Sequence, residues 1–193
     1  MPSPEGDNIM DSAFIYQAAN ELVKNAGTRN IKQIARSCSL DISETSRIKD
    51  MLGLLSLYFD KPLILINCQL DKQTKQMVCG YALGHYLEHQ LLMDLHTLNK
   101  FLTIKDKHIL LYEHNAFTSH LMLDSDEVYQ MTKRGLDAAQ IATAKRIHIN
   151  LVLVKLLELH HLGYDLRHYH ARHHAFIKQF NLPAHFQFDV AAG

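Results

Sequence analysis

Apolar and polar residues alternate with two different periods, one typical of helices and the other of strands. Near the N-terminus, apolar side chains recur about every four residues over 14–23, which predicts an amphipathic helix. Ser12 is placed to cap this helix and Gly27 to end it. Thr28 is placed to cap a second short helix with the sequence IKQIARSC.

The next apolar runs are short and have the composition of strands. Residues 40–46, LDISETS, fit one short strand. The runs GLLSLYF (53–59) and PLILIN (62–67) are separated by Asp60-Lys61, which is typical of a β-hairpin. These three segments predict a small antiparallel sheet.

The helical period returns after this sheet. Asp71 is a plausible cap for a long helix over residues 71–95. A loop is expected around 97–107, then a helix over 108–123 and another that opens at Ser125. Strands followed by a helical C-terminal half indicate an α+β fold, in which the sheet packs on the 71–95 helix.

Residues 136–163 predict two short helices joined by a turn near 147–149 and ended by Gly163. This helix–turn–helix pattern is one used to bind DNA. However, the second helix offers mainly leucine and valine, with Lys155 as its basic residue, whereas a recognition helix presents several polar or basic side chains to the bases. A packed helical pair is therefore the favoured interpretation, and DNA binding the alternative.

Composition narrows the class of protein. The chain has 193 residues, 47% hydrophobic and 21% charged, which excludes wholesale disorder. Twenty basic residues balance twenty acidic ones, so no global charge favours nucleic acid or an anionic membrane. The chain has no apolar run long enough to span a bilayer, and its start, MPSPEGDN, lacks the pattern of a secretory signal. We expect a cytoplasmic protein whose three cysteines are reduced thiols.

Histidine is the one abnormal residue type. The chain has 14 histidines, all at position 85 or later, and histidine is the commonest metal ligand in proteins. On the predicted 71–95 helix, Tyr81, His85 and His89 share one face, and His85, Glu88 and His89 form the zinc-peptidase motif H-x-x-E-H. A solvated helix rich in histidine and glutamate is the alternative explanation.

Several ordered motifs resemble one family. Residues 53–89 look like the core of the ImmA/IrrE metallo-endopeptidases, a hairpin followed by a capped helix with the motif H-E-L-G-H. Residues 112–118 (YEHNAFT) resemble the family's E-A-N-x-F-A, and 121–123 (LML) its L-L-M-P. The similarity covers about residues 12–167. It implies a zincin-like helical core and a regulatory role, in which members relieve repression by cleaving helix–turn–helix repressors of phages and integrative elements.

This resemblance sets the expected organisation of the chain. Residues 1–11 are a flexible tail, and residues 12–133 form a degenerate zinc-peptidase-like domain. Residues 134–167 are a helical, helix–turn–helix-like pair packed on that domain. Residues 168–193 are a histidine-rich C-terminal tail, for which metal binding is an alternative to a solvated surface.

The departures from the family motif bear on catalysis. Tyr81 stands where the family has its first histidine ligand, and Ala82 stands where it has the glutamate general base, in the sequence Tyr81-Ala82-Leu83-Gly84-His85. His85 matches the second histidine, and Glu113 the carboxylate ligand. Losing a general base typically costs about 10²–10⁴-fold in rate, and a phenol is a poor zinc ligand at neutral pH. The sequence thus predicts a vestigial site, with Asn115 as a former support.

Three fates of the metal site stay open. His89 replaces the lost ligand, so that His85, His89 and Glu113 bind zinc and Glu88 acts as the base. Alternatively, the missing ligand comes from His114 or His120 on the next helix. In the third case no metal binds, and Tyr81 and Ala82 simply pack.

These alternatives lead to three functions. The leading hypothesis is a catalytically degenerate protein of a phage or mobile element that binds a protein partner, either a helix–turn–helix repressor or a host factor, with no membrane partner. The second is an active zinc endopeptidase with a rearranged site that cleaves such a repressor. The third is a DNA-binding regulator that uses residues 136–163.

Overall fold

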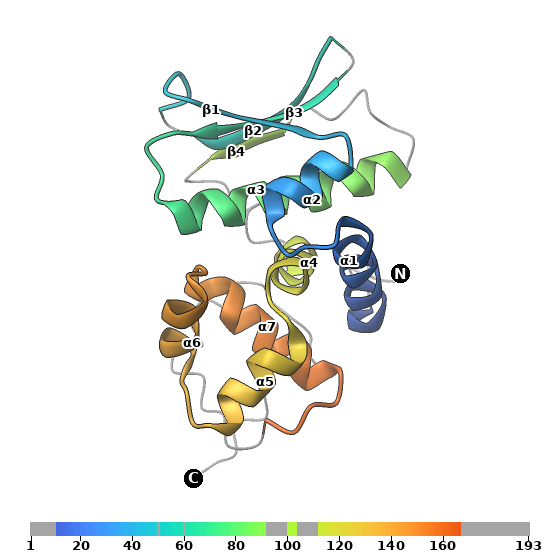
Figure 1. The fold of residues 1–193 in the computed structure, drawn as a ribbon. Coiled ribbons are helices and arrows are strands. Elements are labelled where there is room, and N and C mark those ends of the chain that lie inside the picture. The colour runs from blue at the N-terminus through green and yellow to red at the C-terminus, as the bar shows by residue number, and fades with distance from the viewer. Residues whose placement is uncertain (1–10, 50, 60, 92–99, 104–111, 167–193) are drawn as a thin grey trace, which may run out of the picture.

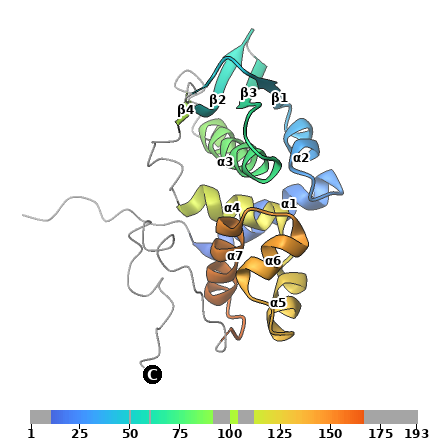
Figure 2. The same ribbon diagram turned by 90° about the vertical axis from the view of Figure 1, so that its left-hand side faces the viewer.

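The computed structural model describes residues 11–49, 51–59, 61–91, 100–103 and 112–166, with the backbone alone at 89–91 and 100–103. The helices are α1 (Ser12–Ala26), α2 (Ile31–Ser37), α3 (Lys72–Leu91), α4 (Tyr112–Met122), α5 (Ser125–Lys133), α6 (Ala138–Lys145) and α7 (Ile149–His161). The strands are β1 (Asp41–Thr45), β2 (Met51–Tyr58), β3 (Lys61–Asn67) and β4 (Lys100–Thr103). They stack in layers, with the sheet on α3, then α4, then the group α5–α7 (Figure 1; Figure 2). The fold is therefore α+β, as predicted.

The two N-terminal helices form where the hydrophobic period predicts them, but other residues cap them. The carboxylate of Asp11 caps α1 by accepting from the backbone N–H of Ala13, whereas Ser12 lies inside the helix and is buried. Gly27 ends α1 in the left-handed region, at φ 64°. The side chain of Asn30, and not that of Thr28, caps α2. Both predicted caps were wrong because a capping side chain one or two positions away satisfies the same helix N–H groups.

The sheet has the strand order β1-β3-β2-β4 and is mixed, so the prediction of a purely antiparallel sheet was wrong. The β2–β3 hairpin is antiparallel, as predicted, but β1 pairs with β3 in parallel. The other edge of β2 is taken by β4, which lies inside the segment predicted to be a loop. A four-residue strand such as β4 carries little local signal, since its hydrogen bonds depend on the neighbouring strand.

One face of this sheet covers α3. Leu55 on β2 and Ile64 and Ile66 on β3 are fully buried, and Asp71 caps α3 as predicted.

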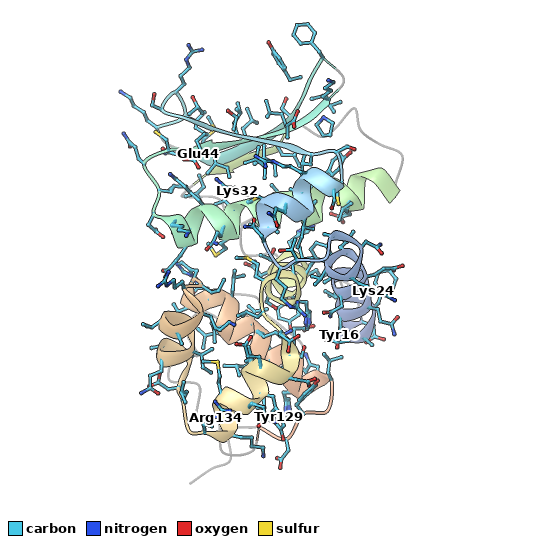
Figure 3. All side chains as sticks on the ribbon, in the orientation of Figure 1. Tyr16, Lys24, Lys32, Glu44, Tyr129 and Arg134 are labelled. Atoms are coloured by element: carbon cyan, nitrogen blue, oxygen red, sulfur yellow. The ribbon has the colours of Figure 1, made fainter. Side chains whose placement is uncertain are left out.

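At the side of these layers, Lys32 of α2 and Glu44 of β1 form a 3.1 Å ion pair (Figure 3). Lys75 of α3 lies 2.8 Å from the same carboxylate, so helix and sheet are also joined at the surface.

The predicted helical pair of the C-terminal half is confirmed as α6 and α7. A capping box of Asp137 and Gln140 begins α6, and α7 packs on α4. Residues 151–159 of α7 are all buried. This helix therefore offers none of those side chains to a DNA groove. Within the described residues, no helix is long and apolar enough to cross a membrane.

Helix α4 is held from two sides. All its residues except Glu113 are buried, and it contacts α1, α3 and α7. On the α3 side, Gly80 allows a close approach, because a Cβ at this position would lie 2.3 Å from Cγ2 of Thr118 on α4. With a larger residue at position 80, α3 and α4 could not lie this close together.

On the α7 side of α4, a buried polar network makes the contact. His120, Lys155 and Glu158 are 0% exposed. Nε2 of His120 lies 3.0 Å from Oε2 of Glu158, and Nζ of Lys155 lies 2.7 Å from Nδ1 of His120. Ser12 of α1 donates to Glu158 at 2.9 Å, and the hydroxyl of Tyr112 donates to the same carboxylate. This network joins α1, α4 and α7 through one carboxylate.

The buried environment of this network lowers the pKa values of three of its side chains. Burial is the largest cause of the shifts of His120 and Lys155. The pKa of His120 is lowered to about 4 and that of Lys155 to about 7. The pKa of Glu158 falls to about 2 because hydrogen bonds from His120, His161 and Tyr112 outweigh the effect of burial. The native state therefore favours a neutral His120 beside an ionised Glu158.

Acid should destabilise the protein through His120. Its pKa is about 4 in the native state, against an ordinary value of 6.5 in the unfolded state. Between these two values only the unfolded state binds the proton. The free energy of unfolding therefore falls as the pH is lowered through this window. The loss should amount to about 3 kcal/mol. Urea unfolding between pH 6.5 and 5.5, above the ordinary pKa of 4.5 that Glu158 has in the unfolded state, should give a shallower slope in His120→Gln than in the parent. His160→Ala, a change at an exposed histidine, is the control, and an unchanged slope in His120→Gln would contradict this assignment.

Gly80→Ala should destabilise the protein, although alanine is favoured over glycine in helices by about 1 kcal/mol. The added methyl group would meet Cγ2 of Thr118 at 2.3 Å and its Oγ1 at 2.9 Å. Overpacking of this kind typically costs about 1–3 kcal/mol, which urea denaturation can measure. Thr118→Ala removes both atoms and should recover part of the loss in the double variant. Additive effects of the two changes would argue against the close contact.

Candidate metal centre

Three potential metal ligands converge where α3 crosses α4. His85 and Glu88 come from α3 and His114 from α4, and one ligand atom of each lies within 4.8 Å of the other two. Oε2 of Glu88 is 3.1 Å from Nε2 of His114 and 3.4 Å from Nδ1 of His85. Both imidazole rings therefore face the same carboxylate oxygen.

Local helical geometry and a glycine bring these side chains together. His85 and Glu88 are three residues apart, so they lie on the same face of α3. Gly84 lets α4 approach this face, since a Cβ there would lie 3.1 Å from Cδ2 of His114 and 3.2 Å from Cδ1 of Phe117. A larger residue at position 84 would require the side chain of His114 or Phe117 to shift.

The cluster is largely enclosed, but it reaches the surface through its carboxylate. His85 and His114 are buried, and the side chain of Glu88 is 43% exposed. The pKa of Glu88 is lowered to about 2, mainly by the hydrogen bond with His114. This carboxylate is therefore ionised at neutral pH. Nδ1 of His114 is buried and has no hydrogen-bond partner among the described residues. An ionised carboxylate between two imidazoles is a ligand set that suits Zn²⁺.

Two positions of the family's motif do not suit a metal site here. Tyr81 is 2% exposed and its ring packs at a tilt on the His114 ring, with 4.9 Å between their centroids. Ala82 is fully buried in the core and supplies no base. Tyr81 and Ala82 therefore pack in the core, and the cluster of His85, Glu88 and His114 lies next to them.

The other predicted residues are distributed around this cluster. Glu113 lies in the first turn of α4, outside the three-residue cluster. His89 belongs to the last turn of α3, but its side chain lies outside the described residues. Asn115 is buried. His120 was wrong as a candidate ligand, because its ring bonds to Lys155 and Glu158 in the network on the α7 side.

Each residue of the cluster was a candidate in the sequence, but the sequence did not group the three. From the sequence, Glu88 was expected to act as a general base. In the structure its carboxylate lies between the two histidines. His114 was one of two candidates on the second helix. The signal that could have separated it from His120 is the six-residue spacing, which places the two histidines on different faces of a helix.

An apolar groove opens beside the cluster. It lies between α1, α3 and α4 and has a volume of about 400 Å³. Its apolar lining consists of Phe14, Ile15, Ala18, Leu22, Leu87 and Phe117. Its polar lining consists of Glu21, Asn25, Glu88, Glu113 and His114. The groove thus combines an apolar surface with three carboxylates, and two members of the cluster form part of its wall.

Comparison of the chain with protein-family models, curated proteins and solved structures finds no match. The resemblance to the ImmA/IrrE family therefore rests on the sequence motifs themselves.

Introducing a glutamate at position 82, where the resembled family has its general base, should destabilise the protein and create no peptidase site. Ala82 is 0% exposed, and burying a carboxylate without a partner costs several kcal/mol. Thermal unfolding of Ala82→Glu should give a clearly lower midpoint. Lys72→Glu, at an exposed position in the first turn of the same helix, should change the midpoint little. An Ala82→Glu variant as stable as its parent would mean that this position opens onto a polar site.

Proposed function

We propose that this protein is a catalytically degenerate relative of the ImmA/IrrE peptidases that acts by binding a protein partner. The partner is a helix–turn–helix repressor or a host factor that inserts a basic, amphipathic segment into the groove between α1, α3 and α4. The role is regulatory, in a phage or mobile element, as an antirepressor or inhibitor. The groove is the observation that carries this proposal.

The shape and chemistry of the groove support this kind of occupant. Its volume of about 400 Å³ lies in the usual range for ligand sites, about 300–1,000 Å³. Phe14 is 54% exposed at the groove, a large apolar surface for a side chain in water. Amphipathic helices bind to grooves of this kind through apolar anchors.

Charge supports a basic rather than an acidic occupant. The three carboxylates of the groove belong to Glu21, Glu88 and Glu113. Glu88 stays ionised at neutral pH because its pKa is lowered to about 2. Lysine or arginine on the polar face of a bound helix would pair with such carboxylates, and acidic segments would be repelled.

The remaining hypotheses have less support. Peptide hydrolysis by the family mechanism needs a general base at position 82, which is a buried alanine. DNA binding through residues 136–163 needs an accessible second helix, whereas residues 151–159 are buried. Binding requires neither of these features.

A peptide assay tests the groove directly. The probe is a synthetic helical peptide with leucine on one face and lysine on the other, and fluorescence anisotropy measures its affinity. Glu21→Lys reverses an exposed charge of the groove, and Phe14→Ala removes an exposed apolar anchor. Each change should weaken binding about tenfold, equivalent to about 1.4 kcal/mol.

The matched control is Tyr58→Ala, which removes an aromatic side chain that is 63% exposed on β2. It should leave the affinity unchanged. Equal binding by the parent, Glu21→Lys and Phe14→Ala would refute the proposal. With a purified helix–turn–helix repressor as the probe, a bound and intact repressor supports binding, whereas a cleaved one would support the endopeptidase alternative.

A further inference from the structure

We infer that His85, Glu88 and His114 bind a zinc ion at the wall of the groove. This ligand set differs from the one that the family resemblance implies, since it omits Tyr81 and Glu113 and adds residues 88 and 114. It also differs from the set of His85, His89 and Glu113 suggested by the sequence. The inference stands on the geometry of the described side chains and does not depend on the proposed partner.

The distances already approach those of a zinc site. Ligand atoms about 2.0–2.1 Å from zinc in a tetrahedral arrangement lie about 3.3–3.4 Å from one another. Glu88 Oε2 lies 3.1 Å from one imidazole nitrogen and 3.4 Å from the other. The remaining separation, between the histidines, is within 4.8 Å. Zinc binding would bring these two nitrogens to a similar separation.

The chemistry of the donors fits zinc better than calcium or magnesium. Two imidazoles and one carboxylate are the protein ligands of many zinc sites that keep a fourth position open, whereas calcium and magnesium prefer oxygen donors alone. The histidines are 8% and 7% exposed, so the surrounding helices fix their positions before an ion arrives. A site that is already assembled loses little conformational entropy on binding.

The groove gives the ion a route in and a place for its fourth ligand. Glu88 and His114 both line the groove, and Glu88 reaches solvent. Water, or a group of the molecule bound in the groove, would complete the coordination. Glu113 lies on the same wall, where its charge would favour a cation.

Metal content of the untagged, full-length protein tests this inference. The protein is dialysed first against a chelator, then against zinc and finally against metal-free buffer, and the bound zinc is measured by mass spectrometry. We expect about one equivalent per chain. Cobalt in place of zinc should give the visible absorption of a four-coordinate ion with nitrogen and oxygen ligands.

The variants separate this site from the other histidines. Glu88→Gln changes one half-exposed side chain, so the fold should persist while zinc affinity falls at least tenfold; His85→Ala and His114→Ala should abolish binding. His160→Ala controls for an exposed histidine on α7. A variant with alanine at His168, His170, His173 and His174 controls for the C-terminal tail. Both controls should keep the full zinc content.

Circular dichroism on each variant separates loss of the ligand from loss of the fold. The inference fails if the parent binds no zinc, or if folded Glu88→Gln and His114→Ala retain it with parental affinity. It also fails if the tail variant alone loses the ion. These measurements use no peptide or repressor, so a negative result here would leave the partner-binding test unaffected.

Discussion

The close crossing of α3 and α4 is the constraint on which the rest of the structure depends. It exists because α3 carries glycine where α4 comes nearest: a Cβ at position 80 would collide with Thr118, and one at position 84 would press on His114 and Phe117. The crossing places His114 beside Glu88 and forms two of the walls of the groove. Side chains on these helices therefore meet at distances set by backbone packing, and not by loops.

The opposite side of α4 is held by a different kind of interaction. A buried carboxylate, Glu158, accepts hydrogen bonds from Ser12 and Tyr112 and lies against His120. Polar groups buried in this way must meet partners in defined directions, because an unpaired group would cost about 1–3 kcal/mol. The network thus specifies the orientation of α4, whereas apolar packing alone would tolerate small rotations. A helix restrained on two sides is a rigid support for a binding site.

The polar chemistry of this region lies one turn along α3 from the family's motif. Tyr81 and Ala82 are part of the core, while Glu88 is ionised and half-exposed beside two buried histidines. Tyr81 and Ala82 stand where the resembled family has charged or ligand side chains, and burying them carries no cost of burying a charge. The carboxylates that remain line an apolar groove, where a basic partner or a cation would be favoured over hydrolysis by the family mechanism.

The sequence by itself determined the elements whose signals are local. The period of α1, the β2–β3 hairpin, the Asp71 cap and the α6–α7 pair were all predicted, because they depend on residues close together in the chain. Only the tertiary structure decided features that need distant partners: the parallel pairing of β1 with β3 and the strand state of β4. The same holds for the site. The sequence offered His89 as the replacement ligand and, alternatively, His114 or His120. Packing decided between the two described side chains by turning His114 toward Glu88 and His120 toward Glu158. The direction in which a helix faces its neighbours is a long-range property, because it depends on the contacts of the whole core.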